Sequence, residues 1–325
     1  MAVLFAAAAI LVFLSTVFIL KWLIPKLKSM KMGQKILEIG PRWHKSKEGT
    51  PTMGGIAFAV PLTIVCALAL LFLKKSNMGD GLPLALTLLL ALGNGIIGCV
   101  DDLTKFYKKQ NEGLTAAQKF ALQLAMAGAF IALMKLYGMI DTVLVIPFTG
   151  IHLELGWFYY VFALVFITGM INSVNLTDGI DGLAASVTCV VAAFLAVLAF
   201  VCANAGLAVL AGAMIGATLG FLVYNFYPAR VFMGDTGSLF LGSLVAGAAF
   251  MIDSPLTVAI AGIIYICEAL SDIIQVLVYK LTHKRVFRMA PIHHHFEKGG
   301  WSEKKIVFVF SAVTLAASVI ACLGY

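Results

Sequence analysis

Charged residues are scarce in this chain: they make up 12% of its 325 residues, whereas 61% are hydrophobic. A soluble domain is nearer half apolar and a quarter charged, so this balance excludes an ordinary water-soluble domain. The six cysteines form no Cys-x-x-Cys pair, which argues against a zinc site or a disulfide framework. No Walker A loop, Gly-x-Ser-x-Gly or His-Glu-x-x-His motif is present, so these signatures of nucleotide hydrolases, serine hydrolases and zinc proteases are missing.

Long apolar runs are present instead, and a membrane span needs about 20 apolar residues. We therefore expect an all-α polytopic membrane protein, with about ten transmembrane helices in one integral membrane domain over residues 1–325. The predicted spans are Ala2–Leu23, Thr52–Leu73, Leu82–Val100, Ala117–Leu136, Trp157–Val174, Leu183–Val201, Leu207–Tyr224, Gly237–Ile252, Leu256–Tyr279 and Lys305–Leu323. The segment Asp141–Leu155 has β-branched residues around a turn and predicts a short β-hairpin.

The basic residues indicate an orientation in the membrane. All 23 lysines and arginines except Lys74, Lys75 and Lys135 follow the first, third, seventh or ninth predicted span. The positive-inside rule places those loops in the cytoplasm, both termini outside and the hairpin on the periplasmic surface. The net charge of +7 is typical of loops that face lipid headgroups, so no nucleic-acid partner is predicted.

Two adjacent carboxylates, Asp101 and Asp102, follow the third predicted span. Burying one carboxylate at the bilayer centre costs about 3 kcal/mol, and a second beside it adds repulsion. We therefore expect the pair at the membrane–water edge near a cation, with lysines of the next turn contacting phosphate oxygens and the carboxylates holding Mg²⁺. The alternative is a solvated end of the span, although carboxylates are unfavourable at a helix C-terminus.

Four further polar segments are predicted on the same face. They are Lys45–Gly55, suited to an anion at a helix start; Asn172–Leu183, dense in Asn, Asp and Gly; Asn225–Ser238, with Asp235 between glycines; and Arg288–Glu297, with three consecutive histidines. Each has a simpler explanation as a helix cap, a turn or a solvated loop. Their convergence on one membrane face favours a site for a phosphate-bearing soluble donor and an acceptor at the bilayer edge.

The ninth predicted span carries two acids, Glu268 and Asp272. An ionisable residue at membrane depth is a functional candidate. We therefore expect this span to be broken or bent out of the bilayer, and the alternative is a helix that projects into water and leaves both acids solvated.

Taken together, these motifs resemble the phospho-N-acetylmuramoyl-pentapeptide transferase family, within the polyprenyl-phosphate N-acetylhexosamine-1-phosphate transferases. The motifs that carry the resemblance are Gly49–Gly55, Asp101-Asp102, Asn172–Ala184, Phe232–Asp235 and Ala290–Glu297. The resemblance implies a homodimer in the bacterial inner membrane that needs Mg²⁺. It also implies transfer of phospho-MurNAc-pentapeptide from UDP-MurNAc-pentapeptide to undecaprenyl phosphate, giving lipid I and UMP.

The resemblance also implies roles for individual residues. The catalytic residues would be Asp101, Asp102, Asp235, His294 and His295, with Asp235 as the ligand of Mg²⁺. The substrate-binding residues would be Lys45, Thr50, Asn172, Asn175, Asp178, Asp181, Phe232, Gly234, Gln275 and His293. Two other functions stay open: a sibling transferase that uses UDP-N-acetylglucosamine-type donors, against which the three histidines argue, and a secondary transporter, which should carry its charges near the midplane.

Overall fold

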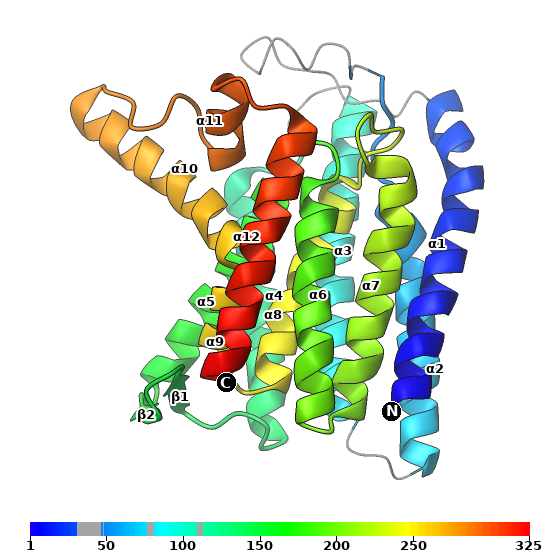
Figure 1. Cartoon of the computed structure of the whole chain (residues 1–325), viewed down its shortest axis with the longest axis vertical. Coiled ribbons are helices and arrows are strands. Elements are labelled where there is room, and N and C mark those ends of the chain that lie inside the picture. The colour runs from blue at the N-terminus through cyan, green and yellow to red at the C-terminus, as the bar shows by residue number, and fades with distance from the viewer. Residues whose placement is uncertain (31–46, 48, 77–80, 109–112) are drawn as a thin grey trace.

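The computed structural model describes residues 1–30, 47, 49–76, 81–108 and 113–325, and these form a bundle of helices with one small hairpin (Figure 1). The helices are α1 (Ala2–Ser29), α2 (Ile56–Ser76), α3 (Leu82–Lys108), α4 (Ala116–Leu136), α5 (Phe158–Thr177), α6 (Leu183–Val201), α7 (Ala205–Asn225), α8 (Gly234–Met251), α9 (Pro255–Ala261), α10 (Ile263–Thr282), α11 (Ile292–Lys298) and α12 (Glu303–Gly324). The predicted all-α polytopic class is confirmed.

Eight described helices, α1 to α7 and α12, are long and apolar enough to cross a membrane. The α9–α10 pair makes a ninth candidate, and its two helices meet at 84° next to Gly262. The ninth span is therefore broken, as predicted, and α10 leaves the bundle obliquely (Figure 1). The remaining predicted span, α8, has an acidic first turn and is buried from Thr236 to Phe250, so it lies inside the protein rather than against lipid.

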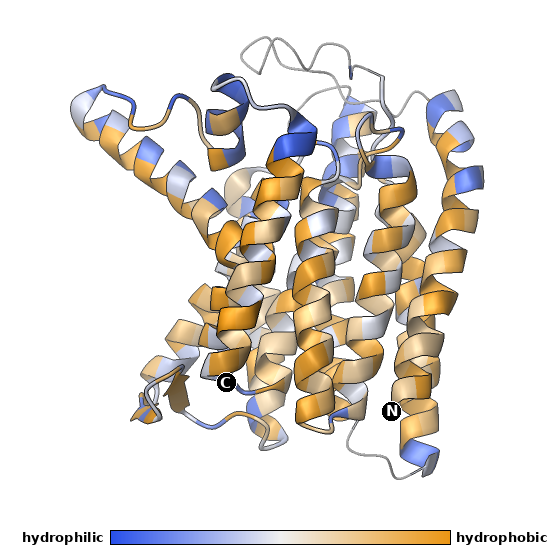
Figure 2. Ribbon diagram, in the orientation of Figure 1, coloured by the Kyte–Doolittle hydropathy of each residue, from blue (hydrophilic) through white to orange (hydrophobic). Residues whose placement is uncertain are grey.

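The predicted hairpin is present, and its strands β1 (Val143–Ile146) and β2 (Ile151–Glu154) pair antiparallel, with Val143 opposite Glu154. It lies at the end of the bundle that also holds both termini (Figure 1). The hydrophilic helix ends gather mainly at the opposite end, together with α11 (Figure 2). The bundle thus has a polar end and an end that carries the termini and the hairpin.

Two helices extend beyond their predicted spans at the polar end. The third span was expected to stop at Val100, but α3 continues to Lys108, so Asp101 and Asp102 are helical residues and not a loop that follows the span. The helix persists because Lys105 lies one turn beyond Asp101 and its ammonium offsets the carboxylates at a helix C-terminus. The eighth span was expected from Gly237, but α8 begins at Gly234 and includes Asp235 in its first turn.

Glycines let α2, α3 and α8 approach one another at this end. A Cβ atom at Gly98 of α3 would strike the main chain of Asp235, and one at Gly55 would strike the main chain of Gly237. Only residues without side chains allow such contact between backbones. The first turn of α8 is therefore held between the end of α3 and the start of α2.

Candidate active site

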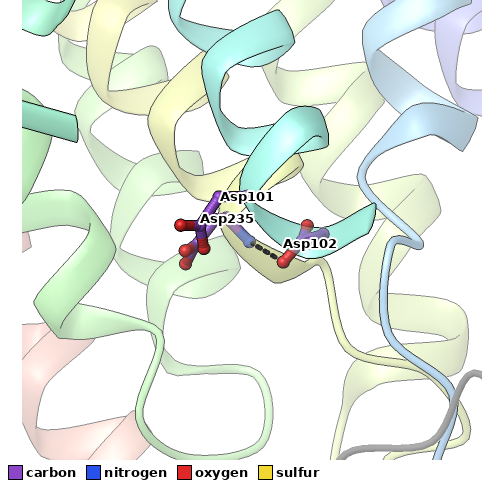
Figure 3. Close-up of side chains that lie close together, drawn as sticks. All are labelled: Asp101, Asp102 and Asp235. Atoms are coloured by element: carbon purple, nitrogen blue, oxygen red, sulfur yellow. Dashed lines mark hydrogen bonds between the residues drawn. The ribbon is translucent and has the colours of Figure 1, made fainter. Parts of the chain in front are cut away.

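Three carboxylates from two helices meet at the polar end of the bundle (Figure 3). Asp101 and Asp102 come from α3 and Asp235 from α8, and one oxygen of each lies within 4.8 Å of the others. Asp101 and Asp102 are 3% and 5% exposed, so water screens them poorly. Three carboxylates this close repel one another unless cations lie between them, so the cluster requires positive charge.

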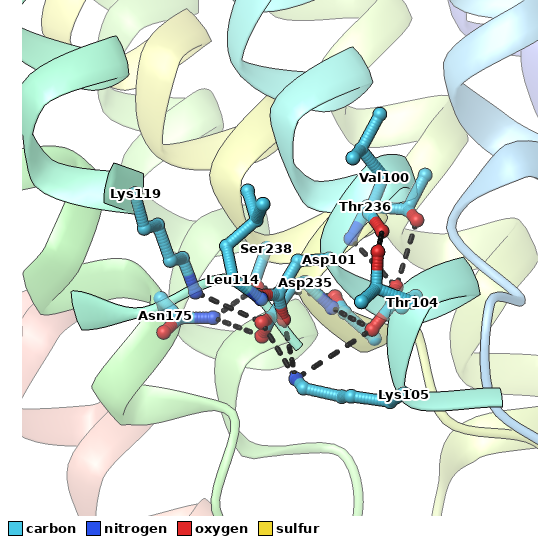
Figure 4. Close-up of polar contacts among 12 residues, drawn as sticks. Val100, Asp101, Thr104, Lys105, Leu114, Lys119, Asn175, Asp235, Thr236 and Ser238 are labelled. Carbon is cyan, nitrogen blue, oxygen red and sulfur yellow. Dashed lines mark hydrogen bonds and ion pairs between the residues drawn. The ribbon is translucent and has the colours of Figure 1, made fainter. Parts of the chain in front are cut away.

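Two lysines supply that charge (Figure 4). The Nζ of Lys105 lies 2.6 Å from Oδ2 of Asp101 and 2.9 Å from Oδ2 of Asp235. The Nζ of Lys119, on α4, lies 2.8 Å from the same oxygen of Asp235. Both lysines thus converge on Oδ2 of Asp235. The third carboxylate, Asp102, has a different role.

Asp102 caps helix α8 from outside the helix. Its Oδ2 accepts hydrogen bonds from the backbone N–H and the hydroxyl of Thr236, at 3.0 and 2.8 Å, and its Oδ1 accepts one from the Asp235 N–H at 3.3 Å. The helix has no side-chain cap of its own, so Asp102 satisfies N–H groups that the first turn leaves unpaired. Asp102 thereby positions Asp235.

Two asparagines of α5 have different environments. Asn175 donates to Oδ1 of Asp235 at 2.9 Å and to Oγ of Ser238 at 2.7 Å, so it belongs to the acidic cluster. Asn172, one turn earlier, donates to Oε1 of Gln123 on α4 at 2.7 Å. It therefore ties α5 to α4, and the structure does not bring it into the acidic cluster.

The loop between α5 and α6 connects the acidic cluster to its surroundings. Burial raises the pKa of Asp178 well above its usual value, and the carboxylates of Asp235, Asp102 and Asp181 raise it further. Gly179 packs against the imidazole of His293, on α11. The loop is therefore close to the acids on one side and to the histidine helix on the other.

Asp181 of this loop is held by a buried ion-pair network. The Nζ of Lys47 lies 2.7 Å from Oδ1 of Asp181 and 2.6 Å from Oε2 of Glu303 at the start of α12. The same Glu303 oxygen accepts the N–H of Asp181 at 3.0 Å, and Oδ2 of Asp181 accepts the N–H of Ala229 at 2.8 Å. The network joins four separate parts of the chain, so its contacts give Asp181 a structural task.

Replacing the cation of this network tests that task. Lys47→Met is expected to lower the free energy of unfolding by about 2 kcal/mol, because it leaves two carboxylates side by side without a counter-charge. The partial exposure of Lys47 keeps the loss below that of a fully buried pair. Unfolding in detergent measures it, and the double variant Lys47→Met with Glu303→Gln should recover part of the loss. Equal stability of Lys47→Met and the unaltered protein would contradict the role.

The three histidines lie on helix α11, and each has a different partner. His293 is 1% exposed, and its Nδ1 lies 2.9 Å from Oε2 of Glu268, which is fully buried on α10. His294 pairs with Glu297 at 2.9 Å, and Nδ1 of His295 accepts the N–H of Arg288 at 3.1 Å. The alternative of a solvated Glu268 was therefore wrong: the bend between α9 and α10 turns this residue toward α11.

The remaining predicted residues divide into two groups. Phe232 lies in the segment before α8. Its N–H donates to the carbonyl of Pro51 at 2.8 Å and its carbonyl accepts from the N–H of Gly54 at 2.8 Å, which brings the segment of Thr50 near Gly234, the first residue of α8. Gly234 has a φ of +70° and a Cβ there would approach Asp102, so only glycine fits. Gln275 instead accepts the N–H groups of Val286 and Phe287 and shapes the turn after α10. Lys45 lies outside the described residues.

Lys119 and Glu303 are not among the predicted site residues, although both belong to the polar networks of the site. Lys119 contacts Asp235 across 116 residues of chain, and Glu303 contacts Asp181 across 122. No local motif marks either residue. The only available signal was their place beside the polar ends of predicted spans, which many surface lysines and glutamates share.

The bundle of membrane-spanning helices gathers carboxylates and lysines at one polar end, and such an arrangement suits a membrane-embedded transferase of phosphate groups. Residues 84–253 match the family model described as Glycosyl transferase family 4, and residues 47–58 match phospho-N-acetylmuramoyl-pentapeptide-transferase signature 1. The phospho-N-acetylmuramoyl-pentapeptide-transferase of Staphylococcus carnosus (strain TM300) is 43% identical over 314 residues, and that of Staphylococcus haemolyticus (strain JCSC1435) is 42% identical. Each alignment covers 96% of both chains.

This chain belongs to the phospho-N-acetylmuramoyl-pentapeptide-transferase family. It is therefore a phosphoglycosyl transferase and a multi-pass membrane protein.

Proposed function

We propose that this protein transfers phospho-MurNAc-pentapeptide from UDP-MurNAc-pentapeptide to undecaprenyl phosphate, forming lipid I and UMP, as one membrane domain over residues 1–325. Family membership supports the reaction. The observation that carries the assignment of the site is the convergence of Asp101, Asp235, Lys105 and Lys119 at one end of the bundle. Such a cluster suits two phosphate-bearing substrates, since carboxylates hold a divalent cation and lysines contact phosphate oxygens.

The donor atoms of the cluster fit Mg²⁺, which prefers carboxylate oxygens. Asp235 would be its main ligand, with Asp101 close enough to supply a second oxygen. Asp102 fits less well, because main-chain N–H groups and the Thr236 hydroxyl hold its oxygens at the start of α8, whereas Oδ2 of Asp235 is held by lysine side chains, which can move away. When bound, Mg²⁺ would supply positive charge to the phosphate oxygens of the donor and stabilise the leaving UMP.

The chain's own residues would then position the reactants. An oxygen of the lipid phosphate attacks the sugar-bearing phosphorus of the donor, and the bond from that phosphorus to the oxygen retained by UMP breaks. Lys105 and Lys119 would bind phosphate oxygens once they release Asp235. Asn175 and Asp102 would keep Asp235 in place, the first through Oδ1 and the second through its backbone. A lipid phosphate is already charged at neutral pH, so positioning contributes more than a strong base.

The loops around the polar end would hold the uridine end of the donor, through the segments of Thr50, Phe232 and Asp178. We also propose that this end faces the cytoplasm, with both termini outside, because the basic residues gather there. We also propose a homodimer, as the resemblance to the family implies. Cysteine labelling from either side of sealed vesicles tests the orientation, and light scattering in detergent tests the dimer.

The decisive experiment measures UMP release from UDP-MurNAc-pentapeptide by the purified protein. Release that requires both undecaprenyl phosphate and Mg²⁺ supports the proposal. Release from UDP-N-acetylglucosamine in preference to the muramoyl donor would favour a sibling transferase. No UMP release from either donor, with a folded protein in a bilayer, would overturn the proposal.

Lys105 competes with a divalent cation for the same oxygens, which gives a separate prediction. Lys105→Met is expected to tighten Mn²⁺ binding at least about tenfold. The variant removes an ammonium group that repels the ion and occupies its carboxylate oxygens, and two charges about 4 Å apart interact by several kcal/mol in a partly buried site. Turnover should fall in the same variant, since a phosphate contact is lost. Electron paramagnetic resonance of Mn²⁺ measures the affinity without substrate. Unchanged affinity would show that the ion binds away from Lys105.

A further inference from the structure

Glu268 and His293 form a buried pair that the proposed chemistry leaves unused. Glu268 is fully buried on α10, His293 is 1% exposed on α11, and Oε2 of the acid lies 2.9 Å from Nδ1 of the ring. The same oxygen lies 3.5 Å from the backbone N–H of His293. Two long-range contacts to one residue fix α11 against α10. A titratable pair is costly to bury, so its place beside the loop between α5 and α6 calls for an explanation.

The contact determines which ring nitrogen carries a proton. An ionised carboxylate only accepts hydrogen bonds, so Nδ1 of His293 is the donor and Glu268 fixes this protonation state. The other ring nitrogen, Nε2, then has a fixed direction. Among the residues that the structure describes, neither Nε2 of His293 nor Oε1 of Glu268 has a hydrogen-bond partner. An unpartnered buried polar atom costs about 1–3 kcal/mol, so a functional contact is the natural explanation.

The direction of Nε2 is set by its neighbour Gly179. A Cβ atom at Gly179 would strike the ring at Nε2 and Cε1, so the imidazole lies directly on the main chain of this loop. Gly179 is itself exposed, so the ring lies beneath a surface residue of this loop. The adjacent residue is Asp178, whose carboxyl group interacts electrostatically with Asp235 and Asp102. Nε2 therefore lies against a loop whose neighbouring residue, Asp178, interacts with the acidic cluster.

We infer that Glu268 is a positioning residue: it holds the Nδ1 proton of His293 so that Nε2 contacts a phosphate oxygen of the nucleotide donor beside Gly179. The inference rests on the proposed function, since it needs a diphosphate at this site. It gives each of the three histidines a different role. His293, oriented by Glu268, contacts the ligand; His295 shapes the turn at Arg288; and His294 pairs with Glu297.

Glu268→Gln tests the inference, because the amide keeps the size of the side chain and removes its charge. We expect kcat to fall about 10- to 100-fold, the range found when a carboxylate that orients a histidine is lost. The KM for the nucleotide donor should change less, because Glu268→Gln alters the orientation of one contact and leaves the other donor-binding residues in place. Asp272→Asn is the matched control: it removes an acid one turn further along α10, and its kcat should stay within about twofold.

A spectroscopic readout distinguishes positioning from simple support of the fold. In protein labelled with ¹⁵N-histidine, UDP with Mg²⁺ should shift the Nε2 resonance of His293, and Glu268→Gln should abolish this shift. The measurement on unaltered protein needs no variant, so it stays decisive if Glu268→Gln does not fold. Gly179→Ala should also abolish the shift, because the added methyl group displaces the ring.

Two results would overturn the inference. One is an Nε2 resonance that UDP leaves unchanged in the unaltered protein. The other is a Glu268→Gln variant with full kcat, whatever its thermal stability. Failure of the proposed function looks different: UDP would still shift His293, while no UMP would be released from the muramoyl donor.

Discussion

Asp235→Asn is expected to lower UMP release about 100- to 1,000-fold while the protein stays folded. Oδ2 of Asp235 is the atom that both lysines contact, at 2.9 and 2.8 Å, and we propose Asp235 as the main ligand of Mg²⁺. The amide keeps the volume of the side chain and its contact with Asn175, but it removes the charge that holds a divalent cation. Losing a preorganised electrostatic contact of this kind costs about 3–4 kcal/mol in the transition state, which gives the expected factor.

The measurement is UMP release as a function of Mg²⁺ concentration, with Mn²⁺ binding followed in parallel. Asp253→Asn is the matched control, because Asp253 lies just beyond the other end of α8. Burial and the nearby Asp141 raise the pKa of Asp253 to about 6, so an amide should cost the fold little, and turnover should be unchanged. An Asp235→Asn variant with normal turnover and normal Mg²⁺ dependence would refute the ligand assignment.

The second expected result concerns Asp102, which we assign to positioning and not to the metal. Asp102→Ala should lower the free energy of unfolding by about 4 kcal/mol, because three hydrogen bonds to the start of α8 lose their acceptor in a buried site. Turnover should be lost with it, since the first turn of α8 carries Asp235. Asp102→Asn retains one acceptor oxygen and should lose about half as much stability.

Chemical unfolding in detergent and Mn²⁺ titration together separate the two roles. Thr236→Val removes only the hydroxyl contact to Asp102 and should cost about 1 kcal/mol, with ion binding intact. If Asp102→Ala kept native stability but bound no Mn²⁺, Asp102 would be a ligand and its capping role would be wrong. If it lost stability but bound the ion at its remaining carboxylates, the capping role would stand.

Much of the fold could be predicted because hydropathy and turn composition are local properties of a membrane chain. A bilayer forces each apolar run to satisfy its own backbone hydrogen bonds, so the run itself predicts a helix. The hairpin between Asp141 and Leu155 followed from its β-branched residues in the same way, and the break in the ninth span followed from its two acids. Hydropathy did not predict how far α3 extends beyond its span, because a salt bridge from Lys105 to Asp101 lets the helix continue past its acids.

The sequence by itself determined the membrane class, the polar segments and the kinds of side chain available to a phosphotransfer site. The tertiary structure alone decided how those side chains are used. It separates Asp102 from the other two carboxylates by placing it against the N–H groups of α8. It also selects His293 from three consecutive histidines by burying Glu268 opposite it. These outcomes depend on partners more than 20 residues away in the chain, brought together where glycines allow backbones to touch, and no local pattern encodes such distances.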